Sequence, residues 1–134
     1  CFTALSFADI RELTTDEIMD VNGEKWIISK RHKTGVPFQV KLLDIPLQII
    51  GKYRPFQKDN SVFGEINYWN VCKKLKKVIS ECGINKQISF HCSRHTFGTL
   101  ALSKGMPIES VSRVLGHTNI KTTQIYASAP RLVA

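Results

Sequence analysis

The chain has 134 residues, of which 43% are hydrophobic, so it can bury the core of one ordinary domain without disulfides or a structural metal. It contains no apolar run long enough to cross a bilayer, which argues against a membrane partner. The formal net charge of +8 is typical of proteins that bind nucleic acid, although ribosomal, membrane-surface and heparin-binding proteins share it.

The first residues and the cysteines lead to two further expectations. The first residues, Cys1-Phe2-Thr3-Ala4-Leu5, read like the inside of a helix. We therefore expect residues 1–134 to be a single domain, the C-terminal part of a longer protein. The four cysteines form neither a CxxC pair nor a zinc-like spacing, and we expect reduced, mostly buried thiols.

The first half of the chain predicts a short helix, a turn, a strand, a second turn and a second strand. In order, these are residues 2–13, 20–23, 26–28, 33–35 and 38–42. The two strands form a β-hairpin whose turn is approached by a basic run, Lys30-Arg31-His32-Lys33.

The second half predicts helices separated by loops and glycines. The expected helices are 47–53, 68–82, 91–103, 107–115 and a last helix from a cap at Thr118 or Asn119 through Tyr126. In helix 68–82, residues Val71, Leu75, Val78, Ile79 and Cys82 form one apolar stripe. Its lysines at 73, 74, 76 and 77 lie largely off the stripe, on a solvated face or a DNA-facing patch. The predicted fold class is mainly α with a small antiparallel β-hairpin (α+β).

His91 and Arg94 are three residues apart and share one face of a helix. A guanidinium offers a rigid fork of donors to two phosphate oxygens, and an imidazole exchanges a proton near neutral pH. This pair therefore suits a phosphate. His91 and His95 have a spacing that can hold zinc, but no third ligand is evident, so we predict no metal at this pair.

Tyr126 follows His117 by nine residues. At about 100° per residue, this spacing places the two side chains on opposite faces of an unbroken helix. Both can face one phosphate only if the helix breaks between them, and Gly116 and Thr118-Asn119 supply the residues for that break.

The combination resembles the catalytic domain of the tyrosine recombinase and integrase family over nearly the whole chain. The matching stretches are Lys33-Thr34-Gly35-Val36, His91-Cys92-Ser93-Arg94-His95-Thr96-Phe97, Leu115-Gly116-His117-Thr118-Asn119-Ile120 and Thr122-Thr123-Gln124-Ile125-Tyr126. The sequence as a whole is similar to those of integrases of mobile elements in Bacteroides-like bacteria.

The resemblance implies site-specific DNA recombination, with strand cleavage and religation that need neither metal nor ATP. It implies that Tyr126 attacks the phosphate to give a 3′-phosphotyrosyl intermediate, that Arg94 binds the non-bridging oxygens, and that His91 accepts the phenol proton. His117 would donate a hydrogen bond to the phosphate, and Lys33 would protonate the leaving 5′-oxygen, with Lys30 as the alternative acid.

One position departs from the family pattern. The family has an arginine in a Thr-Gly-Leu-Arg context, where this chain has Thr3-Ala4-Leu5-Ser6. Either another basic residue such as Arg31 or Arg11 reaches the site, or this subgroup works without that arginine, or the enzyme is weakened.

The implied partners are double-stranded DNA and, in the full-length protein, three further copies in a homotetramer on two duplexes. The implied location is the bacterial cytoplasm, at the nucleoid, and a missing N-terminal lobe would make part of the DNA contact. The alternatives are a type IB topoisomerase, a DNA-binding module without catalysis, and a structural or protein-interaction domain.

Overall fold

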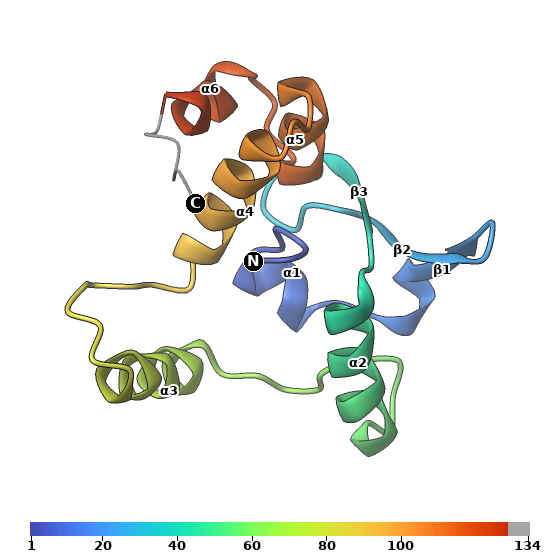
Figure 1. The fold of residues 1–134 in the computed structure, drawn as a ribbon. Coiled ribbons are helices and arrows are strands. Elements are labelled where there is room, and N and C mark those ends of the chain that lie inside the picture. The colour runs from blue at the N-terminus through green and yellow to red at the C-terminus, as the bar shows by residue number, and fades with distance from the viewer. Residues whose placement is uncertain (129–134) are drawn as a thin grey trace.

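A computed structural model describes residues 1–128 of the chain. Figure 1 shows the order of the elements within these residues. They are α1 (Phe7–Arg11), a 3-10 turn (Thr15–Glu17), β1 (Ile18–Val21), β2 (Glu24–Lys30), β3 (Pro37–Lys41), α2 (Asp44–Tyr53), a second 3-10 turn (Arg54–Phe56), α3 (Tyr68–Glu81), α4 (Cys92–Ser103), α5 (Ile108–Leu115) and α6 (Lys121–Ala127).

The predicted fold class, mainly helical with a small antiparallel sheet, is confirmed. The sheet has the strand order β1-β2-β3, and Ile27 at its centre pairs with Ile18 on one side and Val40 on the other. The predicted hairpin corresponds to β2 and β3.

Strand β1 was not predicted, because residues 20–23 were read as a turn from their composition. The turn is only Asn22-Gly23, with φ values of 54° and 82°. A two-residue loop with positive φ at both positions matches the twist of the flanking strands, so Asp20 and Val21 join β1 and pair with β2.

The prediction for the first helix was wrong at its start. Residues 1–5 are not helical, and Ala4 has a positive φ of 56°. Helix α1 begins at Phe7 because Ser6 caps it: the Ser6 hydroxyl accepts a hydrogen bond from the Asp9 backbone, and the Asp9 side chain binds back to Ser6.

The later helices agree with the predicted ranges within three residues at each end. Gly83, Gly105 and Gly116 follow α3, α4 and α5, each with a positive φ. The expectation of mostly buried thiols was wrong. The thiols are free, but none is buried, and Cys1 and Cys82 are exposed.

Two hydrophobic clusters organise the described residues. One lies beneath the sheet and comprises Leu5, Leu13, Ile27, Phe38, Val40, Leu42 and Val62. The other lies among α4, α5 and α6 and comprises Ala4, Val111, Leu115 and Tyr126. Val114 packs against both, and α5 also packs on β3, so α5 joins the helical region to the sheet.

Helix α3 stands apart from the sheet at the end of two long connections (Figure 1). Its predicted apolar stripe is only partly covered: no residue of α3 is buried, and Val78 is 52% exposed. Among residues 1–128, no helix combines the length and the hydropathy that a membrane crossing requires.

Candidate active site

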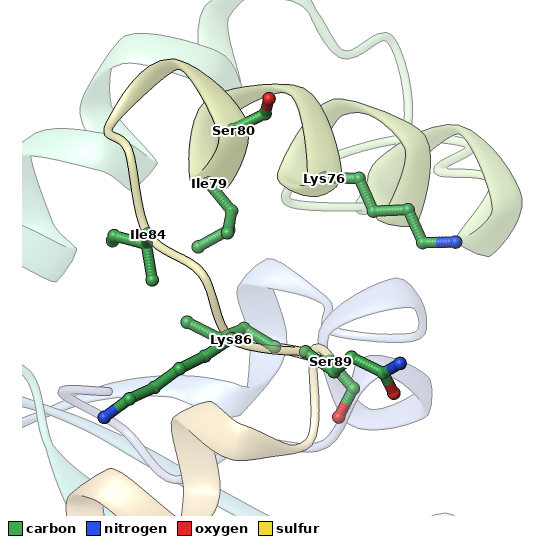
Figure 2. Close-up of a pocket in the computed structure, with 8 residues that line it drawn as sticks. Lys76, Ile79, Ser80, Ile84, Lys86 and Ser89 are labelled. Atoms are coloured by element: carbon green, nitrogen blue, oxygen red, sulfur yellow. The ribbon is translucent and has the colours of Figure 1, made fainter.

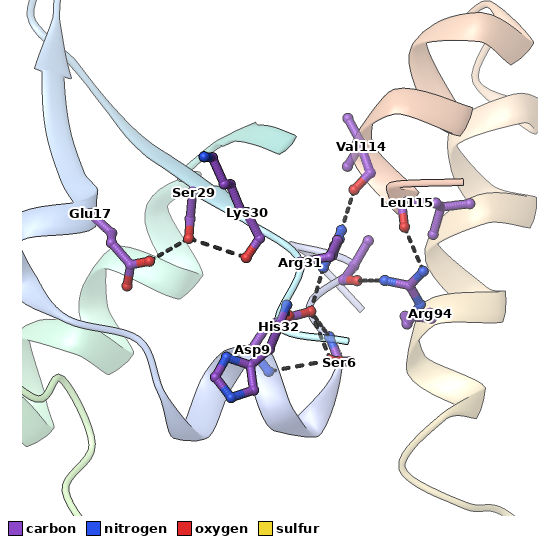
Figure 3. Close-up of polar contacts among 11 residues, drawn as sticks. Ser6, Asp9, Glu17, Ser29, Lys30, Arg31, His32, Arg94, Val114 and Leu115 are labelled. Carbon is purple, nitrogen blue, oxygen red and sulfur yellow. Dashed lines mark hydrogen bonds and ion pairs between the residues drawn. The ribbon is translucent and has the colours of Figure 1, made fainter. Parts of the chain in front are cut away.

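The C-terminal end of α5 brings two arginines together (Figure 3). Arg94 of α4 donates one hydrogen bond to the Leu115 carbonyl at 2.6 Å and another to the Ala4 carbonyl at 2.7 Å. Arg31, which follows β2, donates to the Val114 carbonyl. The last carbonyls of a helix lack partners within the helix and carry partial negative charge, so they hold cations well.

Arg31 is fixed on its other side by Asp9. Its Nη1 lies 2.6 Å from Asp9 Oδ2, the same oxygen to which the Ser6 hydroxyl donates at 2.7 Å. Both members of the ion pair are almost fully buried. The guanidinium therefore lies beside Ser6, the position where the resembling family has its arginine.

The second candidate for that role, Arg11, behaves differently. Its side chain is 48% exposed and pairs with its neighbour Glu12 on the surface of α1. Of the two basic residues named in the sequence analysis, Arg31 is the one that contacts the helix end that also holds Arg94.

Gly116 makes room for Arg31. A Cβ atom at this position would lie 2.6 Å from Arg31 Cγ and 2.8 Å from its Nε. That Nε is buried and has no hydrogen-bond partner in the described part of the chain. Because buried donors are nearly always paired, this nitrogen is an exception within the network.

The charges of this network influence one another. Burial alone raises the pKa of Asp9, but hydrogen bonds from the His32 backbone, Ser6 and Arg31 outweigh it, and the pKa lies below its usual value. Burial lowers the pKa of Arg94, and the nearby charge of Arg31 lowers it further. Two buried cations that repel each other gain from a shared anion.

Tyr126 of α6 points into the second hydrophobic cluster and is 9% exposed. Burial raises the pKa of its phenol, while the charge of Arg94 acts in the opposite direction. The phenol is therefore protonated at neutral pH, and its oxygen needs a proton acceptor to become a nucleophile.

His117 lies between α5 and α6, which confirms the predicted helix break. Its Nδ1 forms a 2.8 Å hydrogen bond with Oγ1 of Thr123, a fully buried residue. The imidazole is stacked against Tyr126, with ring centroids 6.3 Å apart and an interplanar angle of 12°. Thr123 thus orients the His117 ring and leaves Nε2 free for another partner.

His91 immediately precedes α4. Its ring centroid lies 4.7 Å from that of His95, and the two rings are nearly perpendicular. His95 in turn lies 5.3 Å from the Tyr126 ring. The pKa of His91 is lowered by burial first, and then by the charges of His95 and Arg94. Burial, followed by the Arg94 charge, also lowers the pKa of His117. His95 was not predicted as a site residue, since its only signal was its spacing from His91.

Lys33 lies in the exposed turn between β2 and β3, and Lys30 is the last residue of β2. Within residues 1–128, no hydrogen bond or ion pair of the Lys33 side chain is present. The turn is closed by Arg31, whose backbone bonds to Val36 and Gly35. Lys33 is two residues from Arg31, a span of at most about 7 Å between Cα atoms. Its exposed side chain is thus tethered close to the Arg31 backbone and has no partner that fixes it.

The cluster lies apart from the hollow beside α3. Figure 2 shows this hollow of about 700 Å³, between α3 and the segment 84–89, lined by Lys76 and Lys86 among others and by no residue of the cluster. Residues 1–128 contain no group of three or more His, Cys, Asp and Glu side chains placed to hold a metal ion. The cluster offers two fixed cations, neutral imidazoles and a phenol, a combination that suits one phosphoryl group.

Comparisons with known proteins give the context of this cluster. Residues 2–131 match the phage integrase family. The tyrosine recombinase XerA of Saccharolobus solfataricus is 33% identical over 116 residues, which are 86% of this chain and 39% of that relative.

Two solved structures share the fold. The crystal structure of XerA recombinase has a TM-score of 0.79 and 22% identity, covering 96% of this chain and 50% of that one. XerH recombinase bound to its palindromic difH substrate, in a post-cleavage complex, has a TM-score of 0.78 and 21% identity, covering 94% and 39%. The chain thus spans half or less of the length of each of these relatives.

Proposed function

Because the chain belongs to the phage integrase family, we propose that it is the catalytic part of a site-specific DNA recombinase that uses Tyr126 as its nucleophile. The observation that supports this most strongly is the meeting of separate segments at one point. Arg31 after the hairpin strand and Arg94 on α4 meet at the C-terminal end of α5. The charge of Arg94 reaches the phenol of Tyr126, and the His117 ring stacks on it.

In the proposed reaction, Tyr126 Oη forms a bond to phosphorus and the bond from phosphorus to the 5′-oxygen breaks. The phenol proton passes to His91, and Lys33 gives a proton to the departing 5′-oxygen. The product is a 3′-phosphotyrosyl link and a free 5′-hydroxyl, so the energy of the phosphodiester is kept for religation.

The acid–base states support these roles. Since burial holds the pKa of His91 and His117 below the ordinary value, both imidazoles are neutral at pH 7. A neutral imidazole accepts the proton that Tyr126 must lose, and His117 Nε2 carries a hydrogen for the phosphate when its Nδ1 accepts from Thr123. Because the side chains supply the charge, the reaction needs no metal or nucleotide cofactor.

We propose that Arg31 replaces the family arginine that is absent at Ser6. Arg94 uses two of its five donors on backbone carbonyls and keeps three for phosphate oxygens. Arg31 uses one hydrogen of Nη1 on Asp9 and one of Nη2 on the Val114 carbonyl, and it keeps the second hydrogen of each for the same purpose. Its approach beside Ser6, through the shared Asp9 carboxylate, supports a functioning enzyme over a weakened one.

The general acid is proposed to be Lys33 and not Lys30. Lys30 ends strand β2, where its direction is set by the sheet, whereas Lys33 is free in the turn that Arg31 closes. A proton donor must follow the leaving oxygen as it departs, and a long, unpaired side chain on a short tether can do so.

The proposed partner is double-stranded DNA, for which the net charge of +8 and the DNA-bound XerH relative give support. The proposed setting is a mobile element acting on the bacterial nucleoid, with residues 1–134 as the catalytic domain. Homotetramer assembly on two duplexes is part of the same proposal.

The test is covalent capture of DNA. The full chain is incubated with nicked duplexes of randomised sequence, from which the short released fragment with the free 5′-hydroxyl diffuses away. Protein–DNA adducts are then resolved after denaturation. We expect an adduct with the wild type and none with Tyr126→Phe, because only the phenol oxygen is removed.

The alternatives give different results in this assay. DNA binding without any adduct would contradict the recombinase proposal and favour a non-catalytic binding module. Relaxation of supercoiled plasmid regardless of sequence, with adducts drawn evenly from the randomised pool, would favour a topoisomerase.

A further inference from the structure

The phenol ring of Tyr126 lies against the backbone of α4 at Gly98. A Cβ atom added to Gly98 would lie 3.0, 3.1 and 3.2 Å from Cδ2, Cγ and Cε2 of the tyrosine ring. Contacts this short would displace the ring by a few tenths of an ångström, so the ring lies this close to α4 because residue 98 has no side chain.

Local backbone geometry does not account for a glycine at position 98. It lies in the interior of α4 and lacks the positive φ that explains the glycines after the helices. Glycine in a helix interior costs about 1 kcal/mol relative to alanine. The close approach of Tyr126 is the feature of the structure that accounts for this cost.

His95 bounds the same ring from one turn earlier. Residues three apart share a helix face, so His95 and Gly98 present to α6 together. The His95 and Tyr126 rings are 5.3 Å apart and tilted by 57°, within the range of favourable aromatic pairs. On its other side, Tyr126 stacks with His117. The phenol ring is therefore contacted by the α4 backbone at Gly98, by the His95 ring and by the His117 ring.

We propose that Gly98 and His95 form a seat on α4 that places the Tyr126 phenol, with His95 as a positioning residue for the nucleophile. This inference rests on the proposed function for its effect on DNA cleavage. In it, the proton goes to His91, and His95 acts through the packing of its ring. An error of about 1 Å in placing a reacting group can lower a rate by about 100-fold.

The first test compares two glycines. Gly98→Ala adds one methyl group where Tyr126 lies, and the matched control Gly51→Ala adds the same group in α2, where nothing lies within 4 Å. Both substitutions raise helix propensity. In the full chain, we expect Gly98→Ala to form the covalent adduct at least about 10-fold more slowly at saturating DNA, with unchanged DNA affinity, and Gly51→Ala to match the wild type. A wild-type rate for Gly98→Ala would overturn the proposal.

The second test separates the ring of His95 from its proton. His95→Ala removes both, and His95→Phe keeps an aromatic ring. We expect adduct formation about 10-fold slower for His95→Ala, and a rate within about threefold of the wild type, with an unchanged pH profile, for His95→Phe. If His95→Phe is as slow as His95→Ala, the imidazole acts by proton transfer and the positioning role is wrong.

A third readout does not depend on cleavage. The chain contains three tyrosines, and labelling with 3-fluorotyrosine gives fluorine resonances of which that of Tyr126 is identified by its loss in Tyr126→Phe. The resonance should shift in Gly98→Ala and His95→Ala and stay in place in Gly51→Ala. A shift without any adduct in the wild type would contradict the proposed function but keep the seat. An unmoved resonance in Gly98→Ala would overturn the seat itself.

Discussion

In the helical region formed by α4, α5 and α6, charged side chains are held by backbone carbonyls, whereas in the hairpin turn the lysine is held only through its neighbour. Arg94 bonds to two carbonyls at 2.6 and 2.7 Å. Lys33 has no such partner in residues 1–128, and its turn is anchored by the backbone and side chain of Arg31.

This difference between a fixed arginine and an unpaired lysine matches the roles proposed for them, which are charge stabilisation and proton donation. Groups that bind developing charge act best when they are fixed in advance, since no free energy is then spent on orienting them during the reaction. A group that delivers a proton must reach an oxygen that moves. Arg31 belongs to both regions, because its side chain lies in the fixed network and its backbone closes the exposed turn.

The comparison is tested most severely at Arg31. Arg31→Ala leaves the Asp9 carboxylate buried without its cation, so we expect a loss of about 3–5 kcal/mol in the free energy of unfolding, measured with urea. We also expect covalent adduct formation to fall by about 10²–10³-fold. Adding Ser6→Arg puts a guanidinium next to the same Asp9 oxygen and should recover about 10-fold of the rate. A rate unaffected by Arg31→Ala would exclude Arg31 from the site.

The turn is tested at Lys33, with Lys30 at the end of β2 for comparison. Lys33→Ala should slow cleavage by about 100-fold, as expected for loss of a general acid, with no change in stability because the side chain is exposed and unpaired. A substrate with sulfur in place of the leaving 5′-oxygen needs no protonation and should restore the rate of this variant. Lys30→Ala is the matched control. If Lys30→Ala is the variant rescued by sulfur, the assignment of the acid is reversed.

A smaller effect is expected where a fixed group orients another. Thr123→Val keeps the shape of this buried residue and removes its hydrogen bond to His117 Nδ1. The imidazole then loses its preferred tautomer, and we expect a loss of about 1 kcal/mol, or roughly fivefold in adduct formation. An unchanged rate would mean that the stacking on Tyr126 alone orients the ring.

The smallest effect is on pH dependence. The folded chain lowers the pKa of His91 and His117 below 6.5, so protonation favours the unfolded chain. Their contribution to stability is therefore complete above pH 6.5 and is lost as the pH falls through the lowered values. At subsaturating DNA, the acid limb of the cleavage profile should have its midpoint below 6.5. A midpoint above 6.5 would contradict neutral imidazoles as the working form.

The helical half of the molecule followed from local sequence. Glycines after α3, α4 and α5 end those helices because only glycine adopts the left-handed conformation without strain. The spacing of His117 and Tyr126 required a helix break, which is present between α5 and α6. The sequence likewise identified His91, Arg94, His117 and Tyr126 as candidates. The helix ends and the helix break depend on residues close together in the chain, whereas the four site residues were identified by short motifs whose combination resembles the integrase family.

Contacts between distant segments decided the rest. Nothing near Arg31 in the sequence indicates that it lies beside Ser6, because Asp9 and the Val114 carbonyl that hold it are 22 and 83 residues away. Gly98 looks like an ordinary weak point of a helix until Tyr126 lies on it. Local propensities act through the backbone over a few residues, whereas burial and pairing of charges depend on which segments pack together, and only the tertiary structure sets that.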